Sequence, residues 1–142
     1  MGNGRIVQVS DSVVDVEFKH GNLPKIYDAL YVNVNGETRY MEVAQHVGEN
    51  TVRCIMLAES NELARNMEVK ATGSGISVPV GRCTLGRMFN VLGEPIDGKE
   101  PVSEAETRWE IHRKAPAFES QRPNFEILET GIKVVDLLAP YL

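Results

Sequence analysis

The stretch Arg5-Ile-Val-Gln-Val9, followed after a short break by Val13-Val-Asp-Val-Glu-Phe18, decides the fold of this chain. Both runs are rich in β-branched residues, and apolar and polar side chains partly alternate along them, which is typical of half-buried strands. Residues 27–34 and 38–47 continue this pattern on either side of Asn35-Gly36, a dipeptide that tolerates the positive φ of a type I′ hairpin turn. The sequence therefore predicts strands joined by tight turns.

The remaining N-terminal segments extend this pattern into a small barrel. Residues 51–57 follow Gly48-Glu-Asn50, which is a second hairpin candidate. Residues 60–66 are expected to form one or two helical turns, and residues 67–72 are expected to be the last strand. Five or six strands at a spacing of about 8–12 residues suggest a closed barrel, because closure removes exposed strand edges. The predicted fold class is therefore mainly β, with a barrel domain at residues 1–72.

The tripeptide Gly73-Ser-Gly75 marks the expected boundary, and the pattern loosens beyond it. Residues 76–80 are expected to be extended because Pro79 disfavours a helix, and residues 93–98 form a turn cluster. Apolar residues at helical spacing after Thr130 predict a short helix with Thr130 as its cap. So few elements bury little apolar surface, which indicates that residues 73–142 are the incomplete start of a larger domain.

Composition excludes several classes of function. With 42% hydrophobic and 25% charged residues the chain is globular, and with a net charge of −5 and no basic half it offers no surface for nucleic acid. No apolar run approaches the ~18 residues that span a bilayer, and the N-terminus lacks the apolar core of a signal peptide. In such a chain Cys54 and Cys83 are expected to be reduced and buried.

One segment approaches the spacing of a phosphate-binding loop, which is Gly-x-x-x-x-Gly-Lys-Ser/Thr. In Gly81-Arg-Cys-Thr-Leu-Gly86-Arg87-Met88 the glycine spacing is right, but Arg87 replaces the lysine and Met88 cannot bind a metal ion. A strand followed by a turn with a surface arginine explains this segment better. Gly73-Ser-Gly75 fails as a dinucleotide fingerprint because position 78 is Val.

The other candidate residues show no catalytic pattern. The histidines have no metal-ligand spacing; they are His20, His46 and His112. Three serines lack a Gly-x-Ser-x-Gly context; they are Ser12, Ser74 and Ser103. Glu94 and Asp97 could act as an acid–base pair, but turn formation explains Gly93-Glu-Pro-Ile-Asp-Gly98 as a whole. The charge run at residues 100–110 reads as a solvated face. The sequence therefore predicts no catalytic residue, no cofactor-binding residue and no metal ligand.

Five strings, in order along the chain, carry a resemblance to a known family. They are Gly4-Arg-Ile-Val-Gln-Val9, Ile76-Ser-Val-Pro-Val-Gly81, Thr84-Leu-Gly-Arg-Met-Phe-Asn-Val-Leu-Gly-Glu-Pro-Ile-Asp-Gly98, Ile111-His-Arg-Lys-Ala-Pro116 and Ile127-Leu-Glu-Thr-Gly-Ile-Lys-Val-Val-Asp-Leu-Leu-Ala-Pro-Tyr141. Together they resemble the N-terminal portion of the catalytic beta subunit of rotary F-type ATP synthases. The strings at residues 86–98 and 129–141 are the most specific, because the alpha subunit and the flagellar and vacuolar-type relatives read differently there.

The resemblance implies a crown barrel followed by the start of a P-loop-type nucleotide-binding α/β domain. In the family the barrels hold alternating alpha and beta subunits in a hexameric ring around a central stalk. The phosphate loop and the residues that bind ATP or ADP and Mg²⁺ lie downstream of the string that ends at Tyr141, so no site residue can be carried over. The chain is therefore expected to be a fragment that ends before this loop, supplies subunit assembly and is inactive alone.

Two further expectations concern location and association. The resemblance implies a position on the cytoplasmic side of an energy-transducing membrane, that of a bacterial inner membrane, with membrane contact only through the complex. Apolar residues of the segment 127–142 spread around more than one helical face, so the isolated chain is expected to self-associate, to aggregate or to leave this tail poorly ordered. The alternative function, from a different class, is a stand-alone small barrel that binds partner proteins and has no enzymatic activity.

Overall fold

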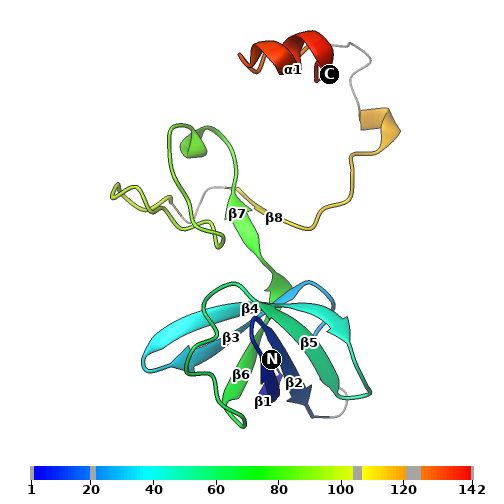
Figure 1. The fold of residues 1–142 in the computed structure, drawn as a ribbon, viewed down its shortest axis with the longest axis vertical. Helices are drawn as coiled ribbons and strands as arrows, with labels where there is room; N and C mark the ends of the chain where they lie inside the picture. The colour runs from blue at the N-terminus through cyan, green and yellow to red at the C-terminus, as the bar shows by residue number, and fades with distance from the viewer. Residues whose placement is uncertain (1, 20–21, 104–106, 121–125, 142) are drawn as a thin grey trace.

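The computed structural model describes residues 2–19, 22–103, 107–120 and 126–141. A barrel forms the N-terminal part, and extended segments with a short C-terminal helix follow it (Figure 1). Within the described ranges no helix combines the length and the apolar character needed to cross a membrane.

Six strands form a closed antiparallel barrel in the order β1-β2-β5-β4-β3-β6, with β6 pairing back onto β1. They are β1 (Asn3–Ser10), β2 (Val13–Phe18), β3 (Asp28–Val34), β4 (Glu37–His46), β5 (Thr51–Met56) and β6 (Glu68–Gly75). The predicted mainly β fold with a closed barrel is therefore confirmed. In the turn between β3 and β4, Asn35 has φ 52° and Gly36 has φ 90°, as expected for a type I′ hairpin.

The barrel interior is filled by alternating side chains of all six strands. On β3 the residues of the core are Leu30, Val32 and Val34, which share one face because successive side chains of a strand point to opposite faces. The complete core cluster comprises Ile6, Val14, Val16, Phe18, Leu30, Val32, Val34, Met41, Val43, Val52, Cys54, Met56, Val69 and Ala71. Register shifts place extra residues in β1, β4 and β6 and bend these strands, which helps so small a sheet to close.

The segment between β5 and β6 contains no helix, so the helical turns expected at residues 60–66 are wrong. Glu62 has φ 69° and Asn66 has φ 71°, and a left-handed backbone cannot continue an α-helix. The Arg39 guanidinium on β4 also donates hydrogen bonds to the carbonyl oxygens of Glu59 and Asn61. This long-range contact fixes the segment as a loop against the barrel.

The chain leaves the barrel through β6, which continues to Gly75 and so includes the tripeptide at which we place the boundary. A two-stranded antiparallel sheet follows, formed by β7 (Ser77–Pro79) and β8 (Arg108–Glu110). The extended conformation expected near Pro79 is confirmed, whereas β8 was not predicted. The 3-10 helices η1 (Arg82–Thr84) and η2 (Phe118–Ser120) are single turns.

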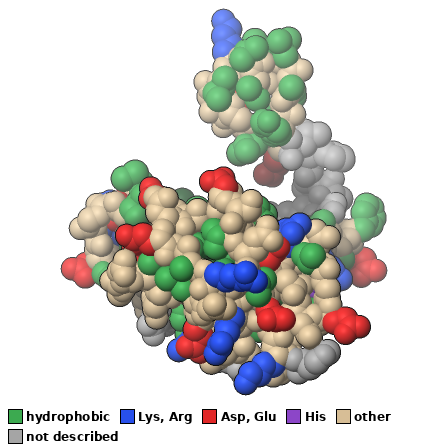
Figure 2. Space-filling view, turned by 60° about the horizontal axis from the view of Figure 1, so that its bottom comes forward, with side chains coloured by type: hydrophobic (Ala, Val, Ile, Leu, Met, Phe, Trp, Pro, Cys, Tyr) green, Lys and Arg blue, Asp and Glu red, His purple; other side chains and the backbone are tan. Residues whose placement is uncertain are grey.

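The C-terminal helix α1 (Lys133–Leu138) confirms the predicted helix but not its cap. Ile132 occupies the N-cap position without a capping side chain, so the expected role of Thr130 is wrong. The Thr130 hydroxyl instead donates to Asp136 Oδ1 at 2.6 Å and accepts from the amide of Ile132 at 3.1 Å. No residue of α1 is buried, and Figure 2 shows hydrophobic side chains gathered on this part of the surface.

Candidate functional site

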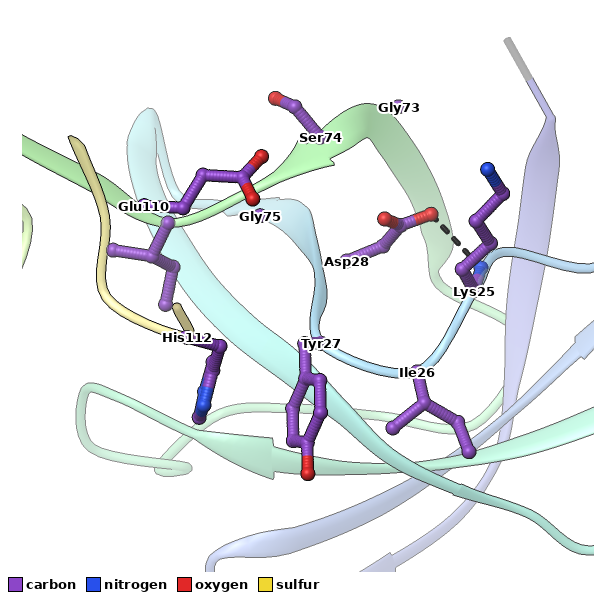
Figure 3. Close-up of a pocket in the computed structure, with 10 residues that line it drawn as sticks. Lys25, Ile26, Tyr27, Asp28, Gly73, Ser74, Gly75, Glu110 and His112 are labelled. Atoms are coloured by element: carbon purple, nitrogen blue, oxygen red, sulfur yellow. Dashed lines mark hydrogen bonds between the residues drawn. The ribbon is translucent and has the colours of Figure 1, made fainter. Parts of the chain in front are cut away.

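The strap, defined as residues 107–113, returns along β7 to the barrel and closes a hollow beside it (Figure 3). The hollow has a volume of about 310 Å³ and is lined by Lys25, Ile26, Tyr27, Asp28, Gly73, Ser74, Gly75, Ile76, Glu110 and His112. It therefore combines the segment before β3, the end of β6 and the strap. This junction joins the barrel to everything downstream.

Tyr27 is held in a strained backbone conformation at this junction. Its φ is 74°, a value that is uncommon for a bulky residue, and its amide donates to the carbonyl oxygen of Val43 on β4 at 2.8 Å. The conformation presents the ring to the strap, where it stacks on His112 with centroids 3.9 Å apart and planes 20° from parallel. Figure 3 shows the two rings side by side, with Ile26 beyond Tyr27.

His112 also contacts β4. Its Nε2 lies 2.9 Å from Oε2 of Glu42, and the Glu42 side chain is 17% exposed while that of His112 is 41% exposed. The strap amide of Ile111 also donates to the carbonyl oxygen of Ile76, between β6 and β7, at 3.0 Å. The strap is therefore bonded both to the segment that leaves the barrel and, through His112, to the barrel itself. The Tyr27–Glu42–His112 contacts thus join three segments distant in sequence.

Carboxylates dominate the rest of the hollow. Asp28 accepts a hydrogen bond from the backbone amide of Lys25 at 2.8 Å, and Glu110 extends over Gly75 in Figure 3. Among the described residues no cluster of three or more histidine, cysteine, aspartate or glutamate side chains could hold a metal ion. The polar groups of the hollow belong to the segments that meet at this junction.

The segment that approaches phosphate-loop spacing forms the 3-10 helix η1 and a turn, as the sequence favours. Arg87 is not the expected surface arginine, because its side chain is only 15% exposed. Arg87, at the lysine position, forms a bidentate ion pair with Asp97 at 2.6 and 3.1 Å and donates to the carbonyl oxygen of Glu100. The hydrogen bonds from Arg87 hold the pKa of the Asp97 carboxyl well below its ordinary value. Thr84 Oγ1 donates to the carbonyl oxygen of Gly81. Arg87 is thus committed to the loop in which it lies.

The possible carboxylate pair Glu94 and Asp97 does not act as a pair. Glu94 accepts from the Asn90 amide side chain at 2.7 Å, while both Asp97 oxygens are bonded to Arg87. The Asn90 side chain also accepts from the backbone amides of Leu92 and Glu94. The turn interpretation of this string is therefore confirmed.

The histidines and cysteines have structural surroundings. His46 Nε2 lies 2.8 Å from the carbonyl oxygen of Pro24, His112 contacts Tyr27 and Glu42, and His20 lies outside the described residues. Both cysteines are free, as expected. Cys54 is buried in the barrel, which confirms its expected burial, whereas Cys83 is only half-buried. Burial raises the pKa of the Cys54 thiol to about 12, which keeps it unreactive.

The serines and the charged run also have ordinary partners. Ser12 Oγ lies 3.4 Å from Oδ2 of Asp11, and Ser74 contacts the Thr72 hydroxyl through its backbone; Ser103 is likewise engaged. The described part of residues 100–110 is largely exposed, as expected for a solvated face. Its last residues form β8, where Arg108 donates to the carbonyl oxygens of Ser77 and Leu92.

Sequence reasoning missed the contact of Tyr27 and Glu42 with His112. Glu42 and His112 are 70 residues apart, and no local pattern marks a tyrosine that adopts a left-handed backbone. Only the closure of the barrel and the return of the strap bring them together.

A comparison with protein families finds a match to the barrel. Residues 6–73 match the model described as ATP synthase alpha/beta family, beta-barrel domain. The barrel is similar to this domain. The match extends from within β1 to within β6, so it coincides with the six strands that the structure closes into one barrel.

Proposed function

We propose that the chain is the N-terminal part of the catalytic beta subunit of a rotary, proton-translocating F-type ATP synthase. The observation that carries this proposal is the family match on a closed six-stranded barrel. The matched description covers alpha and beta subunits alike. The choice of beta is supported by Phe89-Asn90 and by Asp136-Leu-Leu-Ala-Pro-Tyr141, which resemble the beta subunit.

The contribution of this chain to the complex is assembly rather than catalysis. A closed barrel leaves no strand edge for pairing, so its neighbours must be contacted through side chains of the outer wall. Alternating alpha subunits are the proposed neighbours, in a hexameric ring around a central stalk. ATP or ADP and Mg²⁺ are held by other parts of the complete subunit, and membrane contact, on the cytoplasmic side, is indirect.

Exposed apolar side chains after the barrel support the view that these residues belong to a larger domain. Leu85, Met88 and Ile96 in the loop after β7 are each at least 60% exposed, and Leu137 and Leu138 on α1 are 70% and 80% exposed. Single exposed apolar residues are ordinary, but so many in succession indicate surfaces that are covered in the intact protein.

Sedimentation velocity of the complete chain mixed with a purified F-type alpha subunit tests the proposal. A faster-sedimenting mixed species is expected, and an unrelated small barrel protein in place of the chain is the control. If the alpha subunit sediments as it does alone, or if the control forms the same species, the assembly role is refuted.

A stand-alone interaction module is the second candidate, favoured by the self-contained core of the barrel. The coding sequence beyond the codon for Leu142 separates the two. A reading frame that continues into a Gly-rich loop with Lys-Thr supports the catalytic subunit, whereas a stop codon there favours the module.

A further inference from the structure

The contact between the strap and the barrel depends on a group that can gain or lose a proton. The Ile111 amide of the strap donates to the carbonyl oxygen of Ile76. The next residue of the strap, His112, contacts the barrel through its side chain. We name Tyr27, Glu42 and His112 the clasp. Its three side chains come from the segment before β3, from β4 and from the strap.

Several charged groups lie close to His112. Glu42 on β4 lies 2.9 Å from its Nε2, and Asp28, Glu110 and Lys25 line the same hollow. Glu42 contacts the imidazole directly, whereas the other two carboxylates and the ammonium group share the hollow with His112. The phenol ring of Tyr27 stacks on the imidazole, and the face of an aromatic ring attracts a cation.

Protonation changes the strength of both contacts. An imidazolium forms a charge-assisted hydrogen bond with the Glu42 carboxylate and a cation–π contact with Tyr27, whereas a neutral imidazole keeps an ordinary hydrogen bond and simple stacking. We propose that the clasp is a pH-responsive latch, which holds the strap on the barrel when His112 is protonated and loosens it when His112 is neutral. Binding of the strap is thus strongest at acidic pH and declines as pH rises through the range in which histidines titrate.

Amide hydrogen exchange of the complete chain, followed by NMR at pH 5.5 and 7.5, tests the latch. The readout is the protection factor of the Ile111 amide, in which the intrinsic dependence of exchange on pH has been divided out. A value about three- to tenfold higher at pH 5.5 is expected, because a charge-assisted hydrogen bond is roughly twice as strong as a neutral one. Barrel amides such as that of Val52 report whether the fold is intact at both pH values.

Three variants make the test specific. His112→Gln and Glu42→Gln should each reduce the pH ratio of the Ile111 protection factors towards one, and the double variant should show no further change, because the two residues act through one bond. His46→Gln is the matched control, since His46 contacts the carbonyl oxygen of Pro24 away from the strap, and it should leave the ratio intact. A ratio of one in the unaltered chain, or an unchanged ratio in His112→Gln with the barrel protected, would overturn the latch.

Discussion

Asp15 lies on the outer face of β2, opposite to the core residues Val14 and Val16, and its cross-strand neighbour explains why it can be buried there. Asp15 is 8% exposed and lies directly opposite Arg53 on β5. The guanidinium donates to both carboxylate oxygens, at 2.8 and 2.9 Å. These hydrogen bonds lower the pKa of Asp15 although burial acts in the opposite direction. A buried carboxylate is acceptable here because both of its oxygens accept hydrogen bonds from the charged guanidinium of Arg53.

The lowered pKa predicts how Asp15→Asn will behave. In the folded chain the carboxyl takes up its proton at lower pH than in the unfolded chain, so its contribution to stability is present at neutral pH and is lost as pH falls below about 4. Asp15→Asn should therefore lower the free energy of unfolding in urea by about 1–2 kcal/mol at pH 7 and by much less near pH 2. Glu17→Gln, at an exposed position of the same strand, should have little effect. An equal loss for Asp15→Asn at both pH values would contradict this explanation.

At the scale of elements, the strands with regular alternation could be predicted and the short ones could not. Apolar and polar side chains alternate clearly enough in residues 13–18 and 51–56 to predict strands there. The dipeptide Asn35-Gly36 likewise predicts the turn that joins β3 and β4. The three residues of β8 carry no such pattern, because they become a strand only by pairing with β7 about thirty residues earlier. Local sequence cannot report a pairing that tertiary contacts create.

The same distinction explains the candidate site. The sequence correctly predicted that Glu94, Asp97 and Arg87 serve a turn, since those residues interact within about ten positions. The contact of His112 with Tyr27 and Glu42 joins residues that are far apart in sequence, 70 positions for Glu42. Its geometry depends on the left-handed backbone of Tyr27, which no sequence pattern reveals.

The loop between β5 and β6 should depend on Arg39. Its side chain is 13% exposed, pairs with Glu37 and Glu62, and donates to two loop carbonyl oxygens. Arg39→Gln should lower the free energy of unfolding by about 1–2 kcal/mol, because carbonyl groups lose their donors, and amide exchange should rise across residues 59–66. Arg65→Gln, at an exposed position of the same loop, is the control. Unchanged loop exchange in Arg39→Gln would show that the loop is held in another way.

The turn that contains Gly93 should position β7 and β8. Gly93 has φ 73°, and a Cβ there would lie 2.7 Å from Pro79 Cδ and 3.0 Å from Val78 Cα. Gly93→Ala should therefore push the turn off β7 and disturb the surroundings of Trp109, the partner of Val78 on β8. Trp109 is already 48% exposed, so a small red shift of its fluorescence is expected. Trp109 is the single tryptophan of the chain, so the signal is unambiguous.

Gly98→Ala provides a matched control for that experiment. Gly98 has a similar φ of 70°, but a Cβ at this position would meet no atom within 4 Å. Both variants carry the cost of a left-handed alanine, so the difference between them isolates the steric clash. Equal fluorescence shifts in the two variants would mean that backbone strain alone, rather than contact with β7, controls this sheet.

At the scale of the whole molecule, apolar burial is concentrated in the barrel. Among the described residues, the last buried side chain of valine, leucine, isoleucine, methionine or phenylalanine along the chain is Ile76. The barrel satisfies its own backbone hydrogen bonds and encloses one core, whereas the segments beyond β7 meet it through a few polar and ring contacts. The barrel should therefore unfold as one unit, independently of α1.

The exposed helix α1 should drive association of the isolated chain. Val134, Leu137 and Leu138 are 61%, 70% and 80% exposed, and at about 25 cal/mol per Å² their burial against a second molecule is worth several kcal/mol. Light scattering should show association that rises with concentration, and Leu137→Gln combined with Leu138→Gln should reduce it while leaving barrel stability unchanged. Leu85→Gln, which alters an equally exposed leucine outside the helix, should reduce it much less. If the α1 variant associates as strongly as the unaltered chain, the contact lies elsewhere, and the outer wall of the barrel becomes the surface to examine.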